Sequence, residues 1–112
     1  MPAMLTSSAL LVLTNCPDQA SADTLAAALV ELRLAACVNI LASCRSVYRW
    51  QGKVENAEEV PLLIKTTTER YAALESEIRA RHPYELPEIV AIPIEKGLSA
   101  YLQWLSDETR PD

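Results

Sequence analysis

Residues 37–66 read CVNILASCRSVYRWQGKVENAEEVPLLIKT and predict a long β-hairpin. The strand-favouring residues before the turn are β-branched or aromatic: Val38, Ile40, Val47, Tyr48 and Trp50. Gln51-Gly52 fits a two-residue hairpin turn, and the return strand is expected from Lys53 to Thr66. Each arm is about 14 residues long, against 5–6 for a typical strand. The hairpin is therefore expected to project beyond the domain and to need a partner, such as a neighbouring subunit.

The segments that flank the hairpin alternate between strand and helix patterns. A buried strand is expected over Ala9–Thr14, followed by a turn at Asn15–Asp18 and a helix capped by Asp18 or Ser21 that ends near Leu34. That helix presents an apolar face of Leu25, Ala26, Leu29 and Leu32. A second helix, capped from Thr66-Thr67-Thr68, ends near His82 because Pro83 follows. A last strand is expected over Glu88–Glu95, and a third helix over Ser99–Asp107.

This order predicts an α+β fold of the ferredoxin-like kind, β-α-β-β-α-β, with a long hairpin and a C-terminal helix. The four strands are expected to form an antiparallel sheet with helices on one face. The opposite face is apolar, which favours association. The chain of 112 residues is expected to be one domain, with flexible ends at 1–8 and 107–112.

Composition excludes several classes of function. The net charge is −5 without a Lys/Arg cluster, so no nucleic acid partner is expected. No apolar run is long enough to span a membrane, and no export signal is recognisable, so the protein is expected in the cytoplasm. The three cysteines lack the spacing of a zinc site or disulfide framework. With two glycines, the chain carries no Gly-rich phosphate loop.

Three segments together resemble the CutA (divalent-cation tolerance) family. They are Leu34-Ala-Ala-Cys-Val-Asn-Ile40; Ser46-Val-Tyr-Arg-Trp-Gln-Gly-Lys53 with Glu59-Val60 and Leu63-Ile-Lys-Thr66; and His82-Pro-Tyr-Glu-Leu-Pro-Glu88 with Tyr101-Leu-Gln-Trp-Leu105. The resemblance covers roughly residues 9–106. It implies a subunit similar in fold to the PII signalling proteins, assembled as a homotrimer, and a role linked to copper or other divalent cations.

The family's copper ligands are only partly present in this chain. Some members bind copper through a Cys at the end of the first strand and a His-His pair before Pro-Tyr, which correspond here to Thr14, Arg81 and His82. His82 and, as a substitute two residues on, Cys16 are therefore the candidate metal ligands. Arg81 stays protonated and cannot ligate a cation. Pro61, which cannot donate to a strand ladder, predicts a bulge or an unpaired edge.

Further candidates for a ligand cleft are Tyr48, Trp50, Lys65, Tyr84 and Glu88, near predicted strand ends and close to Glu59. Each has a structural alternative: the aromatics can pack in a subunit interface, and His82 can interact with the end of its helix. No nucleophile–base set can be assembled, so no enzyme is predicted. The functional hypotheses are a copper or divalent-cation homeostasis trimer, and a PII-like signalling or adaptor module for which no particular protein partner is indicated. A third hypothesis is a stable trimeric scaffold whose effects on cations are indirect.

Overall fold

The computed structural model describes residues 8–111. Of the ends expected to be flexible, 1–8 and 107–112, residues 1–7 and Asp112 lie outside the described residues. The elements are β1 (Ala9–Cys16), α1 (Gln19–Glu31), β2 (Cys37–Ile40), β3 (Cys44–Trp50), β4 (Lys53–Thr67), α2 (Thr68–Arg81), β5 (Val90–Pro93) and α3 (Ser99–Glu108). The predicted α+β class is confirmed, since an antiparallel sheet is combined with three helices in the described chain.

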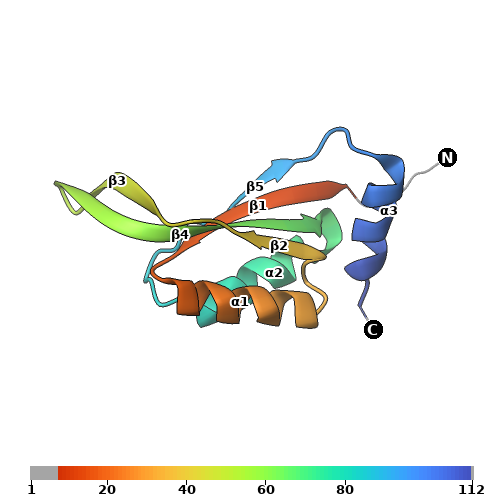
Figure 1. The fold of residues 1–112 in the computed structure, drawn as a ribbon, viewed down its shortest axis with the longest axis horizontal. Coiled ribbons are helices and arrows are strands. Elements are labelled where there is room, and N and C mark those ends of the chain that lie inside the picture. The colour runs from red at the N-terminus through yellow and green to blue at the C-terminus, as the bar shows by residue number, and fades with distance from the viewer. Residues whose placement is uncertain (1–7, 112) are drawn as a thin grey trace.

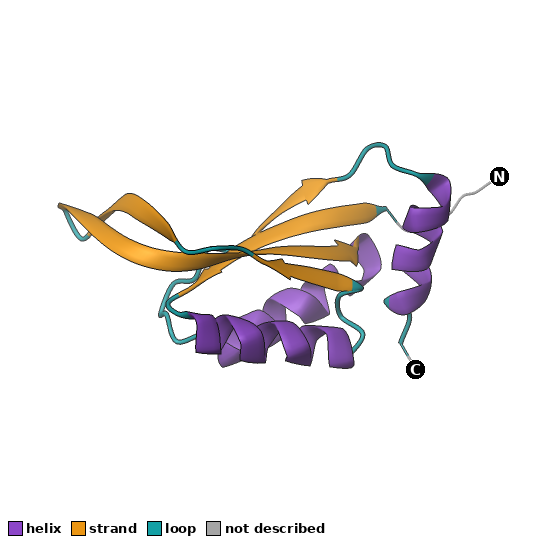
Figure 2. Ribbon diagram, in the orientation of Figure 1, coloured by secondary structure: helices purple, strands orange, loops and turns teal. Residues whose placement is uncertain are grey.

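The sheet has the strand order β2-β4-β1-β5, and β3 pairs with the outer part of β4. Helices α1 and α2 lie side by side against one face of the sheet, while α3 stands across its end (Figure 1). The β3–β4 arm extends away from this body at the opposite end (Figure 2). The molecule therefore measures 51 × 24 × 23 Å.

The hairpin turn lies where the sequence predicts it, at Gln51 and Gly52, whose φ angles are 50° and 82°. Positive φ at both positions is typical of a type I′ turn, whose twist matches that of the strands. The first arm is not one strand, however, but is divided into β2 and β3. Residues 41–43 oppose only residues 60–61 of β4, so the arm contains one extra residue.

This irregularity explains how Pro61 is accommodated. Its carbonyl accepts a hydrogen bond from the Leu41 amide, and the irregular segment 41–43 does not require an N–H from this position. On the other edge Pro61 pairs in regular register with Asn15. The predicted bulge is confirmed, although the extra residue lies in the strand opposite Pro61.

The main core lies between the sheet and the two helices. Helix α1 begins after Asp18, whose carboxylate accepts a hydrogen bond from the Ser21 amide at 2.8 Å, and this bond lowers the pKa of Asp18. The core residues include Val12, Leu25, Ala26, Leu29, Leu62, Ile64, Leu74 and Ile78. Leu32, predicted on the apolar face of α1, is exposed because the helix ends one residue earlier.

Helix α3 closes the end of the sheet through a second apolar cluster, in which Leu105 packs with Ala9 and Ala36. The sequence predicts a flexible end from residue 107, but residues 107–109 are part of this packed region. Asp107 and Glu108 complete α3, and Thr109 is buried, with its hydroxyl donating to the Leu105 carbonyl. None of the helices between residues 8 and 111 combines the length and hydrophobicity that crossing a bilayer requires.

The face of the sheet opposite α1 and α2 is apolar and half-exposed. Across β1 the register pairs Leu11 with Ile92 and Lys65, and Leu13 with Leu63 and Val90. Paired residues share a face, so these six side chains, five of them apolar, form one surface. Val90 and Ile92 are about half exposed, which leaves this surface without a complete cover in the single chain.

Candidate functional site

The polar residues predicted from the sequence gather where β1 ends. There β1 stops at Cys16, β4 continues into the arm, and the loop of residues 82–89 passes from α2 to β5. The turn predicted at Asn15 begins later than expected, because β1 continues through Asn15 and Cys16. Two hollows open on either side of this point.

The smaller hollow, about 300 Å³, is lined by Cys16, Arg81, His82 and the first turns of α1. Both predicted metal ligands therefore lie in one hollow. Arg81 is paired with Glu77 one helical turn earlier. Thr14, at the other position aligned with a family ligand, is fully buried, and its hydroxyl finds no hydrogen-bond partner among residues 8–111.

His82 is held by two hydrogen bonds within the subunit. Its Nδ1 accepts from the Tyr84 backbone amide at 3.1 Å. Its Nε2 lies 2.6 Å from the Asn15 carbonyl oxygen, which requires a proton on that nitrogen. In this tautomer neither ring nitrogen offers a lone pair to a metal ion unless a hydrogen bond breaks.

The protonated state of the Cys16 thiol also disfavours metal binding. Burial, and then the negative charges of Asp18 and Glu59, raise the pKa of its thiol to about 11, whereas the thiolate is the metal-binding form. Within residues 8–111 no three His, Cys, Asp or Glu side chains are grouped so that they could hold a metal ion. The donors of one subunit therefore do not fit a complete metal site.

The larger hollow, about 770 Å³, lies between the arm and the loop after α2 and is called the hairpin cleft below. It brings together four of the five predicted cleft residues: Tyr48, Trp50, Tyr84 and Glu88. Its other lining residues are Asn15, Ser46, Val47, Glu59, Pro83, Glu85 and Leu86. The sequence did not identify Asn15 as a cleft residue, because the Asn-Cys-Pro-Asp pattern indicated only a turn.

Lys65 does not belong to this cleft. It lies in the part of β4 that pairs with β1 and β2, and its ammonium donates to the Asn39 side-chain oxygen at 2.6 Å. It also lies 4.0 Å from the Cys37 sulfur. Six residues of extended strand, about 20 Å, separate it from Glu59. The prediction placed both at strand ends, but β4 is long enough to keep them apart.

Hydrogen bonds fix the polar side of the hairpin cleft. The Tyr84 hydroxyl donates to Glu59 Oε2 at 3.0 Å, and the Asn15 amide donates to Glu88 Oε1 at 3.1 Å. Burial, followed by the hydrogen bond to Glu59 and its charge, raises the pKa of Tyr84 to about 12. The Tyr84 phenol therefore remains a hydrogen-bond donor at neutral pH.

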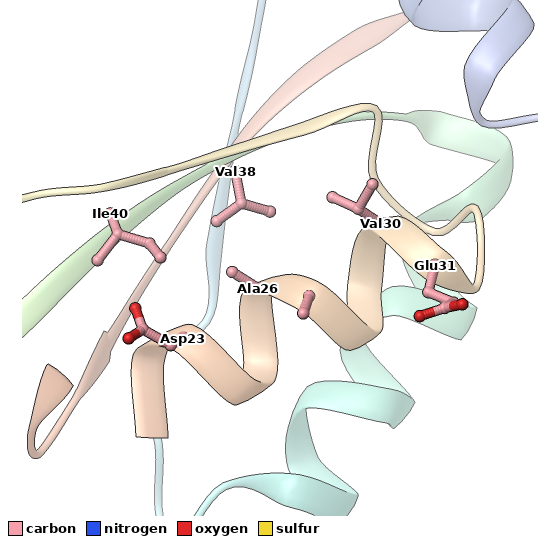
Figure 3. Close-up of a pocket in the computed structure, with 7 residues that line it drawn as sticks. Asp23, Ala26, Val30, Glu31, Val38 and Ile40 are labelled. Carbon is pink, nitrogen blue, oxygen red and sulfur yellow. The ribbon is translucent and has the colours of Figure 1, made fainter. Parts of the chain in front are cut away.

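A third hollow, about 460 Å³, lies between α1 and the edge strand β2. Figure 3 shows Ala26 and Val30 of α1 beside Val38 and Ile40 of β2, with Asp23 and Glu31 at opposite ends. The apolar walls lack converging polar groups that would orient a small ligand. This groove is therefore a weaker candidate for a small-ligand site than the hairpin cleft.

Comparison with known proteins identifies relatives along nearly the whole chain. Residues 10–108 match the family described as "CutA1 divalent ion tolerance protein". A relative from Thermus thermophilus, named "Divalent-cation tolerance protein CutA", is 51% identical over 98 residues, which are 88% of this chain and 95% of the relative.

Solved structures agree with this relationship. The "Divalent cation tolerance protein (Cut A1)" of Thermus thermophilus superposes with a TM-score of 0.90 at 49% identity, covering 91% of this chain and 99% of that one. The CutA structure from Xylella fastidiosa gives a TM-score of 0.90 at 43% identity, covering 93% and 100%. The fold is thus shared along with the sequence.

Proposed function

Because the chain belongs to the CutA1 divalent ion tolerance family, we propose that it is a homotrimeric divalent-cation tolerance protein that binds copper or another divalent cation weakly at clefts between subunits. The observation that carries the general function is the family match over residues 10–108. The proposal includes a cytoplasmic location and no catalytic activity.

Two features of the subunit support a trimer. The apolar sheet face that includes Leu13, Leu63 and Val90 lacks a complete cover, and the β3–β4 arm extends beyond the body. The order β2-β4-β1-β5 supports the ferredoxin-like description of the subunit and, by analogy of fold, a PII-like assembly. Association would cover the apolar face and pair or pack the arm.

The hollow between Cys16 and His82 is the best-supported position for a cation. Binding there is weak in this proposal, because a metal must break a His82 hydrogen bond and remove the Cys16 proton. Additional donors would come from another copy of the chain, which is why the site is placed at clefts between subunits.

The test is equilibrium dialysis of the untagged protein against excess copper, zinc or nickel, with the bound metal measured by elemental analysis, because a weakly bound ion would be lost on desalting. About one ion per subunit or per trimer is expected, with loss in His82→Ala and Cys16→Ala. Cys44→Ala is the matched control, since it removes an exposed thiol outside the hollow. Metal-free wild-type protein would reject the metal site.

Light scattering tests the trimer separately. A measured mass equal to one 12.4 kDa chain at micromolar concentration would reject the trimer.

One observation favours a second function, a PII-like signalling or adaptor module. The hairpin cleft is large enough for a small metabolite and combines aromatic side chains with fixed polar groups. A ligand that prefers the folded protein raises its apparent stability. A thermal-shift screen of nucleotides and anionic and cationic metabolites should then show at least one shift, and no shift at millimolar concentration would count against this function.

A further inference from the structure

His82 lies between the two hollows at the end of β1. It lines the smaller hollow together with Cys16, whereas Asn15 and Tyr84 line the hairpin cleft. Its Nε2 lies 2.6 Å from the Asn15 carbonyl oxygen, and its Nδ1 accepts from the Tyr84 amide at 3.1 Å. Both ring nitrogens on the side of one hollow are therefore bonded to residues that line the other.

The imidazole also packs against the Tyr84 ring, with centroids 4.7 Å apart and ring planes inclined at 51°. His82 is otherwise enclosed, with 9% of its surface exposed, so its ring cannot turn toward a ligand without losing these contacts. A ligand that takes either ring nitrogen must break one of the two hydrogen bonds. Because one bond ends on Asn15 and the other on Tyr84, either choice disturbs a residue of the hairpin cleft.

Both of these residues make a second hydrogen bond farther from the imidazole. The Tyr84 hydroxyl donates to Glu59 Oε2 at 3.0 Å, and the Asn15 side-chain amide donates to Glu88 Oε1 at 3.1 Å. Glu59 lies on β4 where the arm begins, and Glu88 lies just before β5. Two hydrogen-bonded paths therefore lead away from the imidazole, and one of them reaches the base of the arm.

The loop of residues 82–89 has few other attachments that would resist such a disturbance. In the part of the chain that the structure describes, three side-chain hydrogen bonds join the loop to the sheet: His82 with Asn15, Tyr84 with Glu59, and Glu88 with Asn15. Leu86, in the middle of the loop, is 71% exposed, so apolar burial holds it only weakly. Segments with few buried contacts open at lower free energy than the core. Loss of a His82 hydrogen bond should therefore move the loop before it perturbs the sheet.

We propose that His82 is a coupling residue, which transmits the binding of a divalent cation in the Cys16–His82 hollow to the base of the arm by releasing the Tyr84–Glu59 hydrogen bond. This inference rests on the proposed function, because the cation is the one placed in that hollow above. It does not require the hairpin cleft to be open to solvent, since a subunit packed against the arm would receive the same change.

Cation affinity tests the coupling, because coupling between two sites is reciprocal. Tyr84→Phe keeps the ring and removes the hydrogen bond to Glu59, so cation binding no longer has to break that bond. The affinity for zinc, measured by equilibrium dialysis of the full chain, is expected to rise about fivefold. Tyr101→Phe is the matched control, since it removes a phenol of α3 outside both hollows and should leave the affinity unchanged.

Amide hydrogen exchange then shows where the change travels. Zinc should accelerate exchange in the loop of residues 82–89 and at the base of the arm in the wild type. His82→Ala breaks the same bonds and should accelerate exchange in both places without zinc. Arg81→Ala removes a neighbouring side chain of the same hollow that is bonded to Glu77, and it should leave exchange at the arm unchanged.

The outcomes separate this proposal from the function on which it rests. If zinc binds equally well to Tyr84→Phe and to the wild type, and exchange at the base of the arm does not respond, the coupling is overturned and the cation site survives. If the wild type binds neither zinc, copper nor nickel, both fail. The exchange comparison with and without zinc uses wild-type protein, so it is decisive even if His82→Ala folds poorly.

Discussion

The two halves of β4 have the same backbone conformation but different surroundings. Residues 60–67 pair with β1, and residues 62–65 also pair with β2. In this half every second side chain is fully buried on the side of the helices. Residues 53–58 pair with β3 alone, and Val54 is 63% exposed. One strand thus passes from a packed core into an arm held mainly by hairpin hydrogen bonds.

This difference shows which half stabilises the subunit. Apolar burial is the dominant favourable term in folding, and it is concentrated around Leu62 and Ile64. The arm carries apolar and aromatic residues as well, including Val47, Val54 and Trp50, but they remain exposed in the single chain. Their stabilising contribution must come from a partner or a ligand.

The largest predicted effect compares a truncation in each half. Ile64→Ala leaves a cavity in the core and should lower the free energy of unfolding by about 3 kcal/mol. Val54→Ala should lower it by less than about 0.5 kcal/mol within the subunit itself. Urea denaturation at two protein concentrations measures both.

The concentration series shows where the arm lies in the assembled protein. If Val54→Ala destabilises more at the lower concentration, the arm is buried between subunits, as proposed for the trimer. Equal, concentration-independent losses in both variants would contradict the distinction between the two halves.

The fold was predictable from the sequence because its signals are local and agree with one another. The hairpin turn at Gln51-Gly52, the cap at Asp18 and the strand-breaking position of Pro61 each follow from the chemistry of one or two residues. The division between β2 and β3 was less predictable, because an extra residue in one arm becomes evident only when both arms are aligned in register.

The candidate site was predictable as a set of residues but not as a geometry. Tyr48, Trp50, Tyr84 and Glu88 do meet in the hairpin cleft, whereas Lys65 lies on the sheet face. The hydrogen bonds of His82 depend on the carbonyl of Asn15, 67 residues earlier, and no local pattern indicates such a partner. Long-range backbone contacts therefore limit what sequence reasoning can say about metal binding.

A second prediction concerns the junction between the halves, where Cys16 pairs with Val60. The thiol has a pKa of about 11 in the folded protein against 9.0 for an unperturbed thiol. Between these values the unfolded chain loses the proton while the folded chain keeps it, so stability falls as pH rises from 9 to 11. Solvent near the hollow weakens the effect, so the expected loss is at most about 2 kcal/mol.

Variants separate this effect from other alkaline titrations. Cys16→Ala should show a shallower decline in unfolding free energy between pH 9 and 11 than wild type. Cys44→Ala, which removes an exposed thiol of the arm, should retain the wild-type decline. Identical pH profiles for wild type and Cys16→Ala would show that the junction does not disfavour the thiolate.

The smallest predicted effect sharpens the description of the packed half, since two buried threonines there differ in hydrogen bonding. Thr66 Oγ1 donates to the Leu34 carbonyl at 2.6 Å, whereas Thr14 Oγ1 has no partner within the part of the chain that the structure describes. Thr66→Val should therefore lower the free energy of unfolding by about 1–2 kcal/mol, because a buried carbonyl loses its donor. Thr14→Val should raise it by about 1 kcal/mol, because it removes an unsatisfied hydroxyl of similar shape. Thermal and urea unfolding of the two single variants and the double variant measure both effects. Equal losses of unfolding free energy in both single variants would mean that the Thr14 hydroxyl is hydrogen-bonded in solution. Thr14 would then not be an unsatisfied buried polar group of the packed half.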